Sequence, residues 1–171
     1  MMSDLLVLAM MLAGITPDGW HVVTERRLGL DAYVYERADG TRVLAIHGTE
    51  TAADLVAIPI RRIFGYSDRY VALAMDYEVD VVIGHSAGGG MASWVGHVAA
   101  IPSVTYNAAV PTQQALRNDG ALQINVVVGG DRWGDPEARP LEGHLAGAYV
   151  RFDPPTGMRT HPMTTVLAAM Q

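Results

Sequence analysis

The segment best suited to covalent chemistry is a serine between two glycines, in the order Gly84-His85-Ser86-Ala87-Gly88. It follows Val79–Ile83, a short apolar and β-branched run that predicts a strand buried on both faces, and it precedes a stretch that predicts a helix. In that context the G-x-S-x-G pattern predicts a sharp strand-to-helix turn that presents the serine hydroxyl as a nucleophile. Gly84 and Gly88 suit such a turn, because a β-carbon at either place would collide where strand and helix approach.

Two other interpretations of this turn compete with a nucleophile at Ser86. A glycine-rich turn can simply pack a helix closely onto a strand, with the serine as its cap. It can also bind an anion through backbone amides, but the sequence has neither G-x-x-x-x-G-K-[ST] nor a well-placed G-x-G-x-x-G followed by an acid about 20 residues later. Phosphate binding is therefore disfavoured, and a hydrolase is weighed against a non-catalytic binding protein on the same fold.

These residues resemble the class 3 (fungal-type) lipases and their bacterial relatives, which have the α/β-hydrolase fold. The resemblance covers most of the chain, although only the first matching segment is individually specific. The matching segments are Gly84-His85-Ser86-Ala87-Gly88-Gly89 against the family's GHSLGG, His47-Gly48-Thr49 with Asp54 against its RGT and a following aspartate, then Thr105–Ala108, Val126–Asp131 and His161 in the same order. His47 stands where the family usually has arginine. The resemblance implies a serine hydrolase with its catalytic groups in the chain order Ser, Asp, His.

A serine hydroxyl needs an imidazole to remove its proton and a carboxylate to hold that imidazole in the right tautomer. Asp131 directly follows a predicted strand and two glycines, at the end of a sheet where catalytic groups are carried, while Asp135 competes with it. Of the two histidines beyond both acids, His161 precedes a proline and so has an extended backbone, whereas His144 lies among glycines. We predict Ser86, Asp131 and His161 as the catalytic residues, with Asp135 and His144 as alternatives.

Attack on a carbonyl creates an oxyanion that needs hydrogen-bond donors. The backbone N–H of Ala87, directly after the nucleophile, is predicted as one donor, and the N–H of Thr49, after an earlier strand, as the second. His85, Tyr106 and Trp133 are predicted to contact substrate. The chain leaves little length for a lid, so an open cleft and an esterase are favoured over a lipase. A thioester, a phospholipid, an acylated polysaccharide or a peptide stays open as substrate, because loops set the pocket.

Composition narrows the partners. The 171 residues are 50% hydrophobic and 18% charged, which is typical of a globular chain. The formal net charge of −6 and the absence of a Lys/Arg-rich run argue against nucleic acid. No histidine pair has metal-ligand spacing and there is no cysteine, so no metal or cofactor is predicted. The expected partner is a small-molecule or lipid-like acyl ester; the oligomeric state stays open.

The apolar run Leu5–Leu12 resembles a secretory signal, but Asp4 replaces the usual positive start and no convincing cleavage site follows. The run is too short to span a bilayer. We predict instead a helix capped by Ser3 or Asp4, a cytoplasmic protein and no integral membrane association.

The remaining patterns predict strands that alternate with helices. The Asp39-Gly40 pair predicts a tight hairpin between the first two strands. The predicted strands are Ala32–Glu36, Arg42–His47, Val79–Ile83, Ser103–Asn107, Leu122–Val128 and Ala148–Phe152. The predicted later helices are two pieces within Thr51–Ala74, then Ala87–Ala100, Thr112–Asn118 and Met163–Met170. This alternation predicts one α/β-hydrolase-like domain over residues 1–171, a mostly parallel sheet flanked by helices and without a cap domain.

Overall fold

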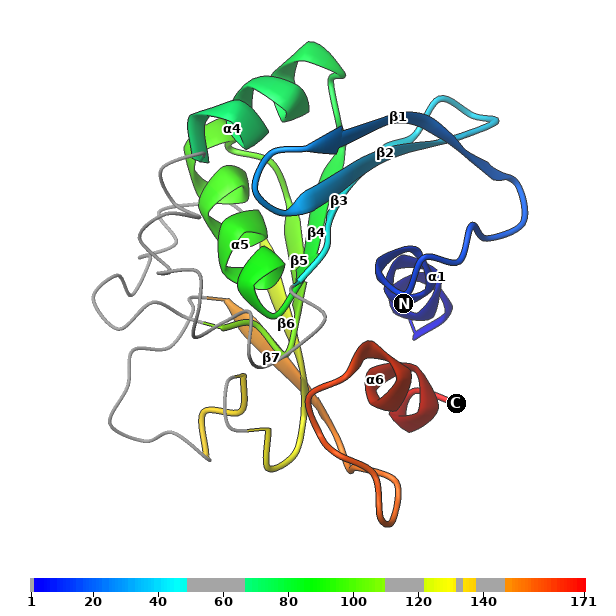
Figure 1. The fold of residues 1–171 in the computed structure, drawn as a ribbon, viewed down its shortest axis with the longest axis vertical. Helices are drawn as coiled ribbons and strands as arrows, with labels where there is room; N and C mark the ends of the chain where they lie inside the picture. Colours follow the sequence, from blue (N-terminus) through cyan, green and yellow to red (C-terminus); the bar gives the residue numbers. More distant parts are fainter. Residues whose placement is uncertain (1, 49–66, 110–121, 132–133, 138–146) are drawn as a thin grey trace.

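A computed structural model describes residues 2–48, 67–109, 122–131, 134–137 and 147–171. A seven-stranded sheet forms its centre, with the strands side by side in chain order (Figure 1). The strands are β1 (Trp20–Arg27), β2 (Asp31–Arg37), β3 (Arg42–Ile46), β4 (Val81–His85), β5 (Ser103–Tyr106), β6 (Gln123–Val128) and β7 (Ala148–Phe152). The pairs β1–β2 and β2–β3 are antiparallel, and every pair from β3 to β7 is parallel.

The order of the strands determines which helices cover which face. Right-handed crossovers between parallel strands that follow one another across a sheet place all the connecting helices on one face. Accordingly α4 (Ser67–Asp76) and α5 (Ala87–Ala99) pack on the same face. The other face is covered by the two terminal helices, α1 (Met2–Leu12) and α6 (Met163–Ala169), which contact each other (Figure 1).

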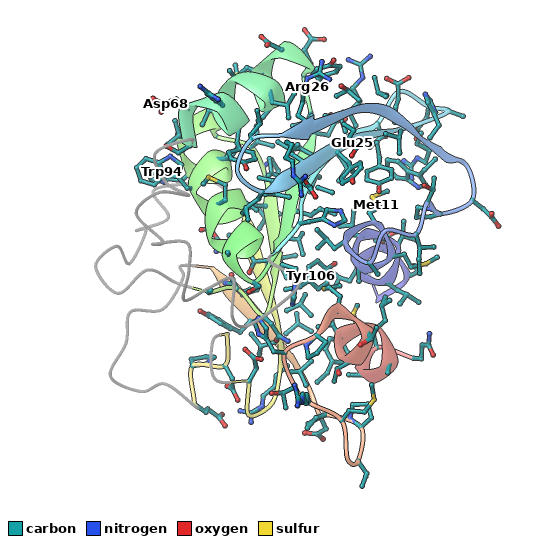
Figure 2. The ribbon with its side chains drawn as sticks, in the orientation of Figure 1. Met11, Glu25, Arg26, Asp68, Trp94 and Tyr106 are labelled. Atoms are coloured by element: carbon teal, nitrogen blue, oxygen red, sulfur yellow. The ribbon has the colours of Figure 1, made fainter. Side chains whose placement is uncertain are left out.

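The core consists of two apolar layers on either side of the sheet. Along β3 the side chains alternate between them: Val43 and Ala45 pack toward α1 and α6, while Leu44 and Ile46 pack toward α4 and α5. All four are buried, as expected for a central strand of a parallel sheet. Figure 2 shows the side chains between the sheet and α1, where Met11 and Tyr106 lie.

The predicted fold class is confirmed: the sheet is mostly parallel and flanked by helices, in an α/β-hydrolase-like arrangement. The six predicted strands and the helices at the nucleophile turn and at the C-terminus are present within two residues of the expected bounds. The hairpin is also present, closed by a bond from the N–H of Gly40 to the carbonyl of Arg37, and only the glycine of the Asp-Gly pair has a positive φ, +87°.

Two expectations need correction. The N-terminal helix begins at Met2, so Ser3 and Asp4 lie in its first turn and do not cap it. The strand β1 was not predicted, because it is an edge strand on which only Thr24 is buried and so it has no clear apolar alternation. The predicted helix Thr112–Asn118 and the first piece within Thr51–Ala74 lie outside the described residues; the second piece is α4, which runs on to Asp76.

Candidate active site

Ser86 occupies a strained turn between β4 and α5. Its φ of 55° and ψ of −122° are rare for a residue with a side chain. The two flanking glycines make the turn possible: a β-carbon on Gly84 would lie 2.1 Å from the carbonyl oxygen of Gly88, and one on Gly88 would lie 2.2 Å from that of Ile46. Both distances are far below van der Waals contact, so the sequence motif has the steric reason that was expected of it.

Backbone hydrogen bonds hold the serine in this conformation. Its N–H donates to the carbonyl of Tyr106 on β5 (3.1 Å), and its carbonyl accepts from the N–H groups of Gly89 and Ala109 at 3.0 and 2.8 Å. The turn is therefore joined both to the first turn of α5 and to the neighbouring strand. This anchoring restrains the residue whose side chain must be aimed.

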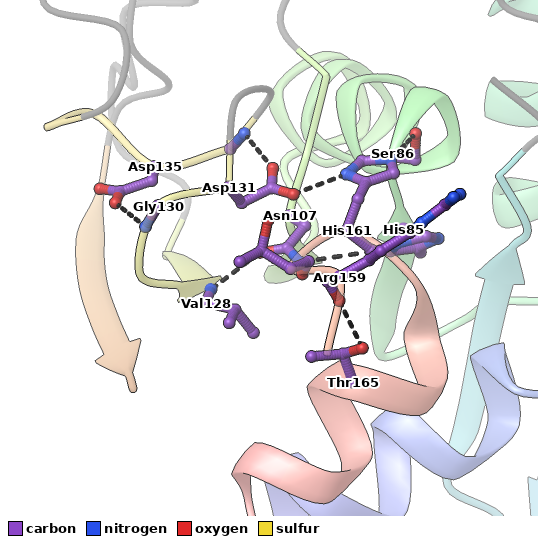
Figure 3. Close-up of polar contacts among 12 residues, drawn as sticks. His85, Ser86, Asn107, Val128, Gly130, Asp131, Asp135, Arg159, His161 and Thr165 are labelled. Atoms are coloured by element: carbon purple, nitrogen blue, oxygen red, sulfur yellow. Dashed lines mark hydrogen bonds and ion pairs between the residues drawn. The ribbon is translucent and has the colours of Figure 1, made fainter. Parts of the chain in front are cut away.

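The side chains of Ser86, His161 and Asp131 form a continuous chain of hydrogen bonds (Figure 3). The Nε2 atom of His161 lies 2.8 Å from the Ser86 Oγ, and its Nδ1 lies 2.9 Å from Oδ2 of Asp131. Since a carboxylate can only accept, Nδ1 carries the imidazole proton and Nε2 accepts from the hydroxyl. This is the arrangement in which an imidazole can take a proton from a hydroxyl.

Different segments carry the three groups to this point. Ser86 follows β4, and Asp131 follows β6, so both lie at the carboxyl ends of parallel strands, where sites in open α/β sheets are found. His161 immediately precedes Pro162, which is extended with ψ 147° and leads into α6. The proline ends the extended segment and starts the helix, as the sequence predicts.

Asp135, the alternative acid, has other partners. Its carboxylate accepts the N–H of Gly130 at 2.6 Å and that of Glu137 at 3.0 Å, and the Nη2 of Arg151 lies 3.3 Å away. It therefore stabilises the turn after β6, in which the N–H of Gly134 also donates to Oδ1 of Asp131 (2.7 Å).

The three groups differ in exposure. Ser86 and Asp131 have no exposed surface, while 26% of the His161 side chain is exposed. In such a setting, where water is largely excluded, hydrogen bonds between charged and polar groups are strengthened. The imidazole is the part of the arrangement that solvent reaches.

His85 supports His161 from below. Its Nε2–H donates to the backbone carbonyl of His161 (2.8 Å), and the two rings lie 5.1 Å apart between centroids. Burial, with a smaller contribution from the nearby His161, lowers the pKa of His85 from 6.5 to about 4. His85 is therefore neutral at physiological pH, and with 8% of its surface exposed it has little area to offer a substrate.

Of the other predicted site residues, Ala87 lies where expected, directly after Ser86 at the start of α5. Tyr106 does not line a cleft: it is fully buried and its hydroxyl donates to the carbonyl of Leu5 in α1 (2.6 Å). Its position on β5 turns the ring toward the terminal helices. Thr49, Trp133 and His144 lie outside the described residues.

One polar residue beside the site was not predicted. Asn107, which follows β5, is fully buried, has a φ of 42° and hydrogen bonds to segments on both sides of it. An asparagine just beyond a strand is a weak sequence signal for a left-handed backbone. Among the described residues, no three His, Asp or Glu side chains come together as metal ligands.

Comparison with known proteins adds little. No protein-family model matches the chain, and no curated protein matches it. A solved structure that it is similar to is a hormone-sensitive lipase from a metagenome library, with 9% sequence identity over 85% of this chain and 80% of that chain and a TM-score of 0.42. A similarity this low carries no function to the present chain. None of the helices in the described residues is long and apolar enough to cross a membrane.

Proposed function

We propose that this protein is a serine hydrolase that cleaves a carboxylic ester through an acyl-enzyme on Ser86. The observation that carries the proposal is the chain of hydrogen bonds from Asp131 through His161 to the Ser86 hydroxyl. A hydroxyl, an imidazole and a carboxylate in this sequence of contacts are the parts of a nucleophile activated by a general base. The sequence resemblance to class 3 lipases points to the same chemistry.

The reaction begins when Nε2 of His161 takes the hydroxyl proton as the Ser86 Oγ bonds to the ester carbonyl carbon. The tetrahedral intermediate then expels the alcohol, which receives that proton from His161, and leaves the acyl group on Ser86. A water molecule next gives a proton to His161 and attacks the acyl carbon. Release of the carboxylic acid returns the proton to Ser86, so the enzyme is regenerated.

The negative oxygen of the tetrahedral intermediate requires donors that are already in place. We assign the N–H of Ala87 as one donor, since it lies at the N-terminus of α5, where the helix dipole also favours negative charge. The N–H of Thr49 is proposed as the second. Gly48 supports this assignment: a β-carbon there would lie 2.9 Å from the Ser86 Cβ, so this segment passes directly beside the nucleophile.

A non-catalytic binding protein is the second candidate, and the burial of Ser86 favours it. A nucleophile with no exposed surface can react only if the atoms covering it move apart when substrate arrives. In the hydrolase proposal the substrate approaches beside His161, the exposed member of the three. The two candidates therefore differ in whether an electrophile can reach the serine.

The test is labelling by a fluorophosphonate together with hydrolysis of short-chain p-nitrophenyl esters. The wild-type protein is expected to be labelled and to hydrolyse the esters, and Ser86→Ala to do neither. Ser93→Ala is the matched control, because Ser93 is also buried in α5 and donates to Gln123 away from the three groups. If wild type and Ser86→Ala are equally inert or equally active, the hydrolase proposal is wrong.

A further inference from the structure

The buried side chain of Asn107 joins the segment that carries the acid to the segment that carries the base. Its Oδ1 accepts the N–H of Val128, the last residue of β6 and three positions before Asp131 (2.8 Å). Its Nδ2 donates to the carbonyl of Thr160 at 2.8 Å, with a longer contact of 3.5 Å to that of His161. Figure 3 shows Asn107 between Val128 and the segment of His161.

The backbone of Asn107 contributes to the same junction. Its N–H donates to the carbonyl of Val126 on β6 (2.9 Å), and a β-carbon on Gly134 would lie 2.6 Å from its Cα. The turn that contains Asp131 therefore packs directly on this residue. The left-handed φ of 42°, which asparagine tolerates better than most side chains, brings the backbone into this contact.

The chemistry of the junction requires an amide. One partner is an N–H that needs an acceptor, and the other is a carbonyl that needs a donor, so a single side chain must supply both. The two partners also determine the orientation of the amide group, since the flipped orientation would oppose donor to donor and acceptor to acceptor. Asparagine satisfies both partners, whereas aspartate, serine or glycine would leave at least one of them unsatisfied.

We propose that Asn107 is a positioning residue for the hydrolytic reaction: it holds the backbone at Thr160 and His161 at a set distance from the strand that bears Asp131. The inference rests on the proposed function. It assigns Asn107 no contact with substrate. The hydrogen bond from His85 to the His161 carbonyl is a second tie of the same segment, to the end of β4. Together the two ties define where the imidazole lies between its partners.

The physical basis is that proton transfer depends steeply on alignment. His161 sits in a connection between β7 and α6, and its ring must reach Ser86 and Asp131 at once. Loss of the tie at Thr160 would let the segment shift, and a misplacement on the order of 1 Å can lower a rate about 100-fold. The expected defect is therefore in reaction rate, with substrate binding little changed.

The test variant is Asn107→Gly, because glycine adopts the φ of 42° without strain while it removes both side-chain bonds. The readouts are the second-order rate constant for fluorophosphonate labelling and the separate kcat and KM for p-nitrophenyl acetate. We expect labelling and kcat to fall by about 10–100-fold with KM little changed. Thr105→Val is the control, since it removes a buried hydrogen bond to Asn125 two residues away without touching either segment.

A double-variant cycle separates positioning from general loosening of the fold. If Asn107 acts through the imidazole, then Asn107→Gly added to His161→Ala should slow labelling no further than His161→Ala alone. Equal additional losses in both backgrounds would overturn the proposal, as would Asn107→Gly reacting at the wild-type rate.

Two further outcomes are decided by the same series. If Asn107→Gly does not fold, Asn107→Asp, which keeps the volume and the acceptor but not the donor, takes its place under the same criteria. If neither folds, the residue is structural and the inference falls. Failure of the proposed function is distinguishable, because wild type and Ser86→Ala would then be labelled alike, and the inference would fall with it.

Discussion

At the scale of single residues, the two aspartates after β6 differ in their partners although both are buried. Asp131 faces the imidazole of His161, while Asp135 receives backbone N–H groups and lies near Arg151. A carboxylate that orients an imidazole affects rate, and one that satisfies a turn affects stability. The same substitution at the two positions should therefore have different consequences.

We expect Asp131→Asn to lower kcat for ester hydrolysis by up to about 10⁴-fold, because an amide in place of the carboxylate favours the wrong imidazole tautomer. Asp135→Asn should instead lower the free energy of unfolding by about 1–3 kcal/mol, because it weakens charge-assisted bonds in the turn. Steady-state kinetics and urea unfolding of both variants measure this. A larger rate loss in Asp135→Asn than in Asp131→Asn would reverse the assignment of the acid.

His85 makes stability depend on pH. Its pKa falls from 6.5 in the unfolded chain to about 4 in the folded one, so between these values the unfolded state binds the proton more readily. The contribution is absent above 6.5, grows as the pH falls, and levels off below about 4. The folded protein should therefore lose up to roughly 3 kcal/mol of stability across that window through His85.

The variant His85→Gln checks this prediction, because glutamine does not titrate but can still donate to the His161 carbonyl. Urea unfolding of both proteins near neutral pH and again at about pH 4.5 should show a smaller decrease for the variant than for wild type. Parallel pH dependence in the two proteins would mean that His85 is not the group responsible.

At the scale of elements, the close approach of α5 to β3 and β4 depends on glycine. Gly88 lies against the carbonyl of Ile46, a backbone atom that cannot move without displacing β3. The first residues of α5 are buried, from Ala87 through Ser93. The helix therefore begins so close to the sheet that side chains are excluded at its first turn.

Gly88→Ala should destabilise the fold by about 2 kcal/mol or more, since overpacking forces backbone shifts. It should also slow fluorophosphonate labelling, because Ser86 moves with the start of the helix. The control is Val98→Ala, a truncation at a position of α5 that is 50% exposed, which should change stability by less than about 0.5 kcal/mol. Thermal unfolding and labelling rates of the two variants check the prediction, and an unperturbed Gly88→Ala would contradict the clash.

At the scale of the whole molecule, the sequential order of the strands leaves one face of the sheet to the chain ends. Only α1 and α6 cover that face among the described residues, and α6 also directly follows His161. The packing of α6 thus couples the second core layer to the position of the imidazole. Thr165 adds to this coupling, since its hydroxyl donates to the carbonyl of Arg159 (2.6 Å).

Val166→Asp places a charge in that layer at a fully buried position. Because burial of an unpaired charge costs several kcal/mol against a total stability of about 5–15 kcal/mol, we expect loss of α6 docking or of the whole fold. Thr164→Asp is the control, an exposed site in the first turn of the same helix, where an acid is favourable. Amide hydrogen exchange of α1 and α6 distinguishes the two, and retained protection in Val166→Asp would show that α6 does not seal this face.

The sequence alone determined the features that depend on near neighbours. The small glycines around Ser86, the β-branched runs of the central strands and the proline after His161 act through local sterics and periodicity, so the serine turn, six strands and the mostly parallel sheet could be predicted. The edge strand β1 escaped prediction because too little of it is buried to leave a pattern.

Only the tertiary structure decided which distant residues meet. The choice of Asp131 over Asp135 as the partner of His161 depends on the path of the turn after β6, and the burial of Tyr106 depends on which face of β5 it occupies. The junction at Asn107 joins residues more than 50 positions apart. Such contacts are created when strands and loops pack together, and no local pattern specifies them, because each depends on the relative placement of segments far apart in the chain.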